Sequence, residues 1–270
     1  MPKPLFLNGS AGRLFAVYHA PAPNAVPRGS FVYVPPFAEE MNRSRRMAAL
    51  QAKALAGLGI GVLLLDLFGT GDSAGDFAEA RWATWLADIL VAADWLEREA
   101  EAPAGLWGLR LGALVATAAA ARSPGRYQRL LFWQPVLDGK AMLTQFLRIR
   151  VAASMTGSQT ETTQELRASL ARGESVEVAG YMLAAELAQA VDGLRMDAFR
   201  PAPGTRVEWL ELAAEPGERL PPAGRGVVEA WRGAGIDIRA RAVAGDPFWA
   251  LQETTIATAL LATTTELLRT

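Results

Sequence analysis

The sequence predicts an α/β fold with a doubly wound, mostly parallel sheet of about eight strands. Short apolar runs alternate with amphipathic helical stretches along the first half of the chain. Such alternation is typical of parallel strands joined by right-handed crossovers. The alternation returns near the C-terminus after a long stretch of helical character. A chain of 270 residues suits one large domain carrying an insertion better than two full domains.

The predicted strands are compact apolar runs. Residues 60–66 form a continuous apolar run between turn residues, which is typical of a strand buried on both faces. Residues 236–243 instead alternate apolar and polar side chains, as a half-exposed edge strand does. The other predicted strands are residues 14–20, 30–34, 105–108, 130–133 and 207–212.

The predicted helices carry apolar residues at spacings of three and four. Residues 80–99 have the clearest such stripe, and Gly57 and Gly59 end a helix over residues 43–58. Further helices are expected over residues 111–122, 222–232 and 252–268.

Residues 138–200 interrupt the alternation. They are mostly helical in pattern and contain no strong strand. We interpret this stretch as a helical cap inserted into a core made of residues 1–137 and 201–270.

The composition of the chain argues against several classes of function. The formal net charge is −1 and no basic run occurs, so we expect no nucleic-acid partner. The chain has no cysteine and a single histidine, His19, which excludes disulfides, thiolate metal sites and His-rich metal sites. We expect neither a metal nor a cofactor. No apolar run is long enough for a signal peptide or a membrane span, so we expect a cytoplasmic protein without membrane insertion.

A glycine-rich turn follows the apolar run at residues 60–66. It has the pattern D-x-x-G-x-G-x-S-x-G, from Asp66 to Gly75, with Ser73 as its serine. A loop that leaves a sheet edge and reverses tightly needs glycines, because they adopt backbone angles that other residues avoid. The alternative is an ordinary glycine-rich turn after a parallel strand.

Dinucleotide binding is a competing use of these glycines. That function needs the spacing G-x-G-x-x-G at the start of a helix. Here the last two glycines of the turn are four residues apart, and Asp72 and Asp76 would repel a pyrophosphate. The sequence disfavours this interpretation.

A second glycine pair frames Arg110. Gly108 and Gly112 flank it between a predicted strand and a predicted helix. A sharp strand-to-helix turn needs glycines where the two backbones nearly touch. In a plainer interpretation the glycines serve helix packing only, and Arg110 is an ordinary surface residue.

These motifs resemble those of the α/β-hydrolases, in which the first turn follows the fourth strand and G-x-S-x-G forms the nucleophile elbow. The loop Pro35–Arg46 stands where those enzymes donate a backbone N–H to the oxyanion hole. Together with the arginine-centred elbow, the loop resembles that of the family called exosortase A system-associated hydrolase 2. The resemblance implies an α/β-hydrolase fold and an association with exopolysaccharide and protein-sorting gene clusters.

The chain departs from the hydrolase pattern at the catalytic residues. Arg110 replaces the nucleophilic serine, and a guanidinium has no lone pair to offer. The usual place of the histidine holds Gly245–Trp249, where Asp246 is the nearest titratable group. Serine hydrolysis needs both a nucleophile and a base. We therefore assign no catalytic residue by the Ser-His-Asp scheme.

Other titratable residues do not restore that scheme. Glu215 and Glu218 are available at the place of the family's acid, after the strand at 207–212. His19 lies on an early strand and is expected at the surface or at a strand edge, remote from the elbow. Ser73 is expected to serve the turn.

Glu39 and Glu40 lie in the loop that faces the elbow. They could act as acid and base if burial raised one pKa. We favour the alternative in which one of them pairs with Arg110, because an unpaired arginine in a half-buried pocket is costly. The pocket candidates are Arg110, Leu111, Phe37, Glu39, Glu40, Asp246 and Trp249.

Two functions remain open. In the first, a hydrolase-fold protein with a degenerate triad binds a small anionic or acyl-bearing ligand beneath the cap, where Arg110 at a helix N-terminus favours anions. Any turnover would be non-standard and would involve Glu39 or Glu40. In the second, the chain is a non-catalytic scaffold or interaction protein for a partner in an exopolysaccharide or protein-sorting pathway. An open polar pocket supports the first, and an exposed apolar patch supports the second.

Overall fold

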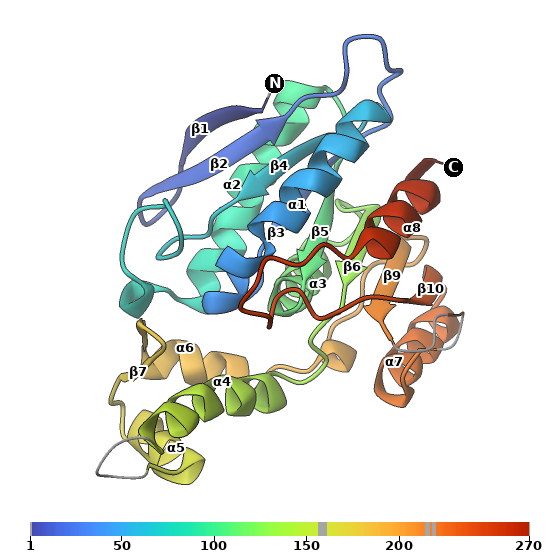
Figure 1. The fold of residues 1–270 in the computed structure, drawn as a ribbon. Coiled ribbons are helices and arrows are strands. Elements are labelled where there is room, and N and C mark those ends of the chain that lie inside the picture. Colours follow the sequence, from blue (N-terminus) through green and yellow to red (C-terminus); the bar gives the residue numbers. More distant parts are fainter. Residues whose placement is uncertain (1, 156–160, 214–216, 218–219, 270) are drawn as a thin grey trace.

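The computed structural model describes residues 2–155, 161–213, 217 and 220–269. The order of strands in its main sheet is β1-β2-β4-β3-β5-β6-β9-β10 (Figure 1). Only β2 runs antiparallel to its neighbours, β1 and β4. The strands are β1 Lys3–Asn8, β2 Arg13–His19, β3 Ser30–Val34, β4 Gly61–Leu65, β5 Ala104–Leu109, β6 Arg129–Trp133, β9 Arg206–Leu212 and β10 Asp237–Val243. The predicted doubly wound, mostly parallel α/β-hydrolase fold is confirmed.

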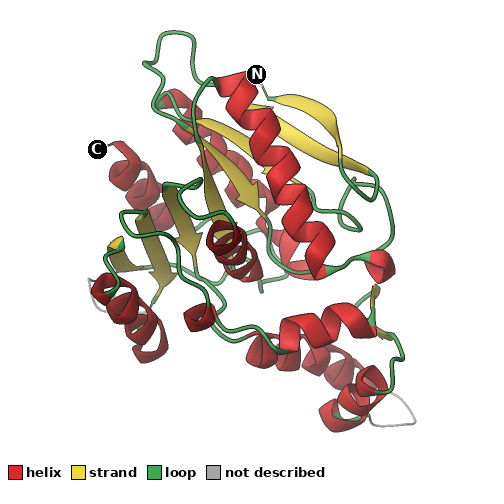
Figure 2. Ribbon diagram, turned by 180° about the vertical axis from the view of Figure 1, so that it is seen from behind, coloured by secondary structure: helices red, strands yellow, loops and turns green. Residues whose placement is uncertain are grey.

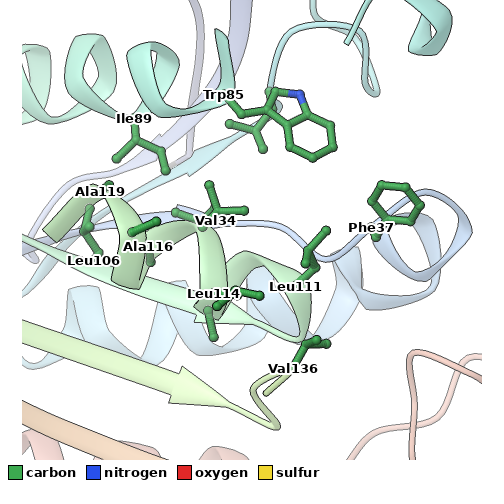
Figure 3. Packing of buried hydrophobic residues seen from close by; sticks show 14 of the residues in the cluster. Val34, Phe37, Trp85, Ile89, Leu106, Leu111, Leu114, Ala116, Ala119 and Val136 are labelled. Carbon is green, nitrogen blue, oxygen red and sulfur yellow. The ribbon is translucent and has the colours of Figure 1, made fainter. Parts of the chain in front are cut away.

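Helices cover both faces of this sheet (Figure 2). On one face α1 (Glu39–Gly57) and α8 (Thr258–Arg269) bury Met47, Leu55 and Leu260. On the other face lie α2 (Trp82–Ala100), α3 (Leu111–Arg122) and α7 (Pro222–Gly233). There Ile89 of α2 and Leu114 of α3 pack with Val34 and Leu106 of the central strands (Figure 3). The central strands are therefore buried on both faces, as their continuous apolar sequences require.

The segment between β6 and β9 contains α4 (Gly139–Ser154), α5 (Thr163–Ala171), β7 (Val176–Val178), β8 (Tyr181–Leu183), α6 (Ala185–Asp192) and the 3₁₀ turn η2 (Met196–Ala198). Figure 1 shows these helices grouped together beside the end of the sheet at which α1 begins. The sequence predicted no strong strand here, and the strands among its described residues form only the short antiparallel hairpin of β7 and β8. Ala179 and Gly180 both have positive φ, which suits the two-residue turn of a tight hairpin.

Three other boundaries differ from those expected. Strand β1 was not predicted, and it pairs along its whole length with β2. Helix α1 begins at Glu39 rather than at residue 43, with two acidic residues in its first turn, where the helix dipole favours them. Helix α8 begins at Thr258 rather than at residue 252.

The Asp66–Gly75 loop is fastened by side chains to its surroundings. Asp66 Oδ2 accepts hydrogen bonds from Arg45 Nη2 at 2.8 Å and from the Asp72 N–H at 3.0 Å. Ser73 Oγ donates to the Asp66 carbonyl at 2.6 Å and accepts from the Phe15 N–H at 2.8 Å. Ser73 therefore joins this loop to β2, as the turn role predicted for it requires. The loop leads into the short 3₁₀ helix η1 (Phe77–Glu79), not into the long helix of a dinucleotide site.

No helix among the described residues is long and apolar enough to cross a membrane. Within the same residues, no group of three or more His, Cys, Asp and Glu side chains is placed to hold a metal ion.

We predict that Ser73→Ala lowers the free energy of unfolding by about 1–3 kcal/mol, because it removes both hydrogen bonds of Ser73 Oγ and leaves the Phe15 N–H without its acceptor. Urea denaturation measures this change. Ser175→Ala is the matched control, because Ser175 is exposed and its loss should cost less than about 0.5 kcal/mol. Equal stability of the two variants would show that Ser73 does not fasten the loop.

Candidate functional site

Arg110 stands between β5 and α3 with φ 55° and ψ −120°. Its N–H donates to the Trp133 carbonyl at 3.0 Å, and its own carbonyl accepts from the Val136 N–H at 3.1 Å. These bonds hold the residue in a conformation that a non-glycine residue adopts at a cost of about 1–3 kcal/mol. Arg110 therefore occupies the elbow position, as the glycine frame predicted.

The two glycines of the frame are required by close backbone contacts. A Cβ atom on Gly112 would lie 2.2 Å from the Val34 carbonyl oxygen, and one on Gly108 would lie 2.3 Å from Ala113 Cα. Neither contact can be relieved by rotating a side chain, because both involve the backbone. The strand-to-helix turn is thus as tight as that of a nucleophile elbow.

The neighbouring strand ends in a turn of the same kind. Ala38, between β3 and α1, has φ 48° and ψ −123°. This turn places Glu39 and Glu40 in the first helical turn of α1. Because β3 and β5 are parallel neighbours, the two turns lie at the same edge of the sheet.

Arg110 is held from two sides. Its Nε donates to Glu40 Oε1 at 3.2 Å, and each of the two side chains is 16% exposed. Its Cζ lies 5.3 Å from the ring centroid of Trp249, within the range of a cation–π interaction. The predicted ion pair is present, with Glu40 rather than Glu39 as the partner. Among the described residues, none accepts a hydrogen bond from Arg110 Nη1 or Nη2.

The two carboxyl groups beside Arg110 are poorly solvated. Glu39 Oε2 and Glu40 Oε2 are buried without a hydrogen-bond partner among the described residues. Burial raises the pKa of Glu40 to about 7, although Arg110 lowers it. Burial also raises the pKa of Glu39, against smaller opposing contributions that include Arg43 and Arg110. Glu40 therefore changes its charge near neutral pH.

A cavity of about 280 Å³ separates this cluster from α4. The sheet-side wall consists of Phe37, Glu39, Glu40, Arg43, Arg110, Trp249 and Ala250. Helix α4 supplies the opposite wall through Met142, Gln145, Phe146 and Ile149. No Ser, Thr, Tyr, Cys or His is found among the described residues that line the cavity.

The structure brings most of the sequence candidates to this cavity, but not Leu111 or Asp246. Leu111 is 1% exposed and lies in the core beneath the elbow. Asp246 is exposed and does not line the cavity. Glu215 and Glu218 lie outside the described residues.

Arg43 and Gln145 line the cavity but were not predicted. Arg43 is three positions after Glu40, a spacing that points to the same helix face, whereas nothing in the sequence places Gln145 against the elbow.

His19 is far from the elbow along the sheet. It pairs with Val62 near the start of β4, whereas the elbow follows the last residue of β5. Of the two positions expected for His19, the surface is wrong, because the residue is 7% exposed; it lies at the end of a strand, as the last residue of β2. Burial lowers its pKa. The single histidine of the chain cannot serve as a base for Arg110 or for any group beside it.

Residues 25–213 match the family model described as serine aminopeptidase, S33. A search of curated proteins finds no match. Similar solved structures include Est1E from Butyrivibrio proteoclasticus with bound ferulic acid, at 17% identity over 98% of this chain and 96% of that chain, with TM-score 0.68. Mouse alpha/beta hydrolase domain-containing protein 10 is 19% identical over 98% of each chain, with TM-score 0.61. XC6422 from Xanthomonas campestris, described as an a/b serine hydrolase without lid, is 17% identical over 99% and 92%, with TM-score 0.58. At these identities the structures show a common fold.

We predict that Arg110→Ala lowers the free energy of unfolding by about 1–3 kcal/mol. This range lies between the cost of breaking an exposed pair and that of breaking a buried one, because each side chain is 16% exposed. A double-mutant cycle in urea should give a coupling energy of about 1 kcal/mol or more with Glu40→Gln and a smaller one with Glu39→Gln. Coupling that is absent, or larger with Glu39, would contradict the observed pairing.

We further predict that stability falls as the pH rises from about 4.5 to about 7. The folded-state pKa of Glu40 is about 7 against an ordinary 4.5. Between these values the folded protein holds a proton that the unfolded chain has released, so raising the pH favours unfolding. The shift corresponds to at most about 3 kcal/mol. Asp88, whose pKa burial raises to about 6, contributes with the same sign.

Comparing the wild-type protein with Glu40→Gln isolates the contribution of Glu40 to this pH dependence of stability. The free energy of unfolding of both proteins is measured in urea between about pH 4 and pH 8. The variant should retain only the shallower dependence due to Asp88 and the other acids. Identical pH profiles would mean that Glu40 does not titrate in this range.

Proposed function

The chain belongs to the serine aminopeptidase S33 family of α/β-hydrolases, and from that premise we propose that it binds a small carboxylate-bearing ligand beside Arg110 without hydrolysing it through a serine. The observation that carries this proposal is the state of the Arg110 guanidinium. Its Nε is bonded to Glu40, its face lies near Trp249, and no described residue accepts from its two terminal nitrogens.

The geometry of Arg110 suits a planar anion. A guanidinium presents its N–H donors in a fixed fork that matches a carboxylate in a bidentate arrangement. Glu40 fixes the orientation of that fork in advance, which reduces the entropy lost on binding. The first backbone N–H groups of α3 lack partners within the helix and add to the attraction for an anion.

The rest of the cavity suits the body of such a ligand. Phe37, Phe146 and Trp249 give it aromatic walls, and Gln145 and Arg43 give it polar groups. Its volume of about 280 Å³ is sufficient for a small aromatic or short acyl group. We propose that residues 138–200 act as a cap over the site, since α4 forms the wall opposite Arg110.

Among its described residues, the site lacks both the nucleophile and the base that serine hydrolysis requires. The elbow carries a guanidinium, the single histidine lies toward the other end of the sheet, and no hydroxyl lines the described wall of the cavity. Ser73, which has the most suggestive sequence context, is fully engaged by the turn. Loss of such a triad removes many orders of magnitude in rate.

A scaffold function is the second candidate, and one observation favours it. Met155 of the 138–200 segment is 68% exposed, and Met182 and Ile149 of the same segment are 41% and 36% exposed. Exposed apolar side chains are frequent at protein–protein contacts. In this alternative the segment would contact a protein partner, consistent with a role in the exopolysaccharide or protein-sorting pathway that the sequence resemblance implies.

Ferulate and methyl ferulate test the leading proposal, since they share a ring system and differ in the carboxylate. Isothermal titration should give a Kd for ferulate at least about tenfold below that for the ester, which corresponds to about 1.4 kcal/mol. Arg110→Gln should abolish the difference. Arg98→Gln removes an exposed charge on α2 and should leave it unchanged. If acid and ester bind wild type equally, Arg110 is not a carboxylate site.

The same protein should not hydrolyse methyl ferulate or p-nitrophenyl acetate above the rate of the Arg110→Gln variant. Ordinary enzymes turn over on the order of 1 per second or faster. Turnover at that rate, lost on replacing a single hydroxyl residue such as Ser73, would overturn the non-hydrolytic assignment while leaving the binding result intact.

A further inference from the structure

A second cavity, which contains two arginines, lies at the opposite end of the strands. It has a volume of about 270 Å³ and is lined by Arg28, Gly29, residues 102–105, Gln128 and Arg129. These residues adjoin the first residues of β3, β5 and β6, whereas the elbow lies beyond the last residue of β5. The two cavities are therefore separated by the length of the strands.

Arg129 is the central side chain of this second cavity. It is the first residue of β6, partly buried, and its Nη1 donates to the Arg28 carbonyl at 3.1 Å. Its Cζ lies 5.4 Å from the ring centroid of Phe31. In the described part of the chain no carboxylate forms an ion pair with Arg129, and no group accepts from its Nε or Nη2. The protein thus positions the guanidinium without a direct ion pair, and the nearby Glu208 carboxylate attracts it electrostatically.

The neighbouring strands add positive charge. Arg129 is the sheet partner of Arg206 on β9, so two like charges project from adjacent positions on one face, which is unfavourable without a counter-ion. Asp237 pairs with Arg206 at 3.3 Å, and Glu208 Oε1 pairs with Arg239. The acids on this face of β9 and β10 thus have arginine partners other than Arg129. Burial lowers the pKa of Arg129, and repulsion from Arg206 lowers it further.

We propose that this cavity is a binding site for a phosphate group. Arg129 would offer Nε and Nη2 as a bidentate donor pair, the arrangement that makes arginine suited to phosphate. Arg28 would supply a second positive charge, and the Gln128 amide a neutral donor. None of the described residues that line the cavity is acidic; the nearest printed carboxylate contact is that of Glu97 Oε1, which accepts a hydrogen bond from the Ala104 N–H at 3.4 Å, and Glu97 is also paired with Arg126. This site is independent of the elbow and of the function proposed for it.

Inorganic phosphate tests the site, titrated by NMR into the full-length protein at constant ionic strength maintained with sodium chloride. Saturable shifts are expected for the backbone amides of residues 28–29 and 128–129. Arg129→Gln should raise the Kd at least about tenfold, and Arg28→Gln should raise it several-fold. Arg225→Gln removes an exposed charge on α7 and should leave the Kd unchanged.

Arg28→Gln keeps the proposal falsifiable if Arg129→Gln unfolds, because Arg28 is exposed and its bond to Arg129 uses the backbone carbonyl, which the substitution keeps. No saturation below roughly 50 mM phosphate, or an equal weakening by Arg225→Gln, would overturn the proposal. Glycerol 3-phosphate and phosphatidylglycerol vesicles, each compared with inorganic phosphate, distinguish a soluble phosphate ester from a lipid headgroup as the source. Binding of either that is weakened several-fold in Arg28→Gln supports the site.

Discussion

The tight turn between β5 and α3 is the constraint on which the rest of the site depends. It exists because Gly108 and Gly112 have no side chains where the backbone of β3 and the start of α3 pass within about 2–3 Å of a would-be Cβ. A turn this sharp forces its central residue into positive φ and projects that side chain beyond the sheet. The fold therefore determines where residue 110 points, whatever its chemistry. An arginine here is presented as a nucleophile would be.

The contacts of Arg110 follow from the projection of its side chain beyond the sheet. A guanidinium in a half-buried position needs compensation, and α1 supplies it through Glu40 while Trp249 approaches its face. Glu40 compensates the charge of Arg110 only in part. One of its oxygens has no hydrogen-bond donor among the described residues, and burial raises its pKa to about 7. The site thus combines a permanent positive charge with a carboxyl group that is only partly ionised at neutral pH. Such a pair differs in kind from a Ser-His-Asp relay, in which proton transfer is the central step.

Local patterns in the sequence predicted the fold and the elbow well. Most βα units of the core have an apolar run, a turn and an amphipathic helix, and these determine structure over short distances. Helix α3 differs, because residues 111–120 are all buried. Strand β1 was missed because its pairing depends on a neighbouring strand rather than on its own pattern. The far wall of the cavity was also missed, since the contact between Gln145 of α4 and the elbow depends on how the 138–200 segment packs. The burial of His19, the last residue of β2, also depends on tertiary packing that the local pattern does not show.

The matching conformations of Ala38 and Arg110 have an electrostatic consequence. Both residues precede helices that start at the same edge of the sheet, α1 of 19 residues and α3 of 12 residues. The N-terminus of each helix carries the equivalent of about half a positive charge, so the two together bring about one unit to the rim of the cavity. This field stabilises Glu39 and Glu40 in the first turn of α1 and offsets part of their poor solvation. The edge of the sheet is therefore an electropositive rim built from backbone dipoles, and it would persist if every side chain around the cavity were replaced.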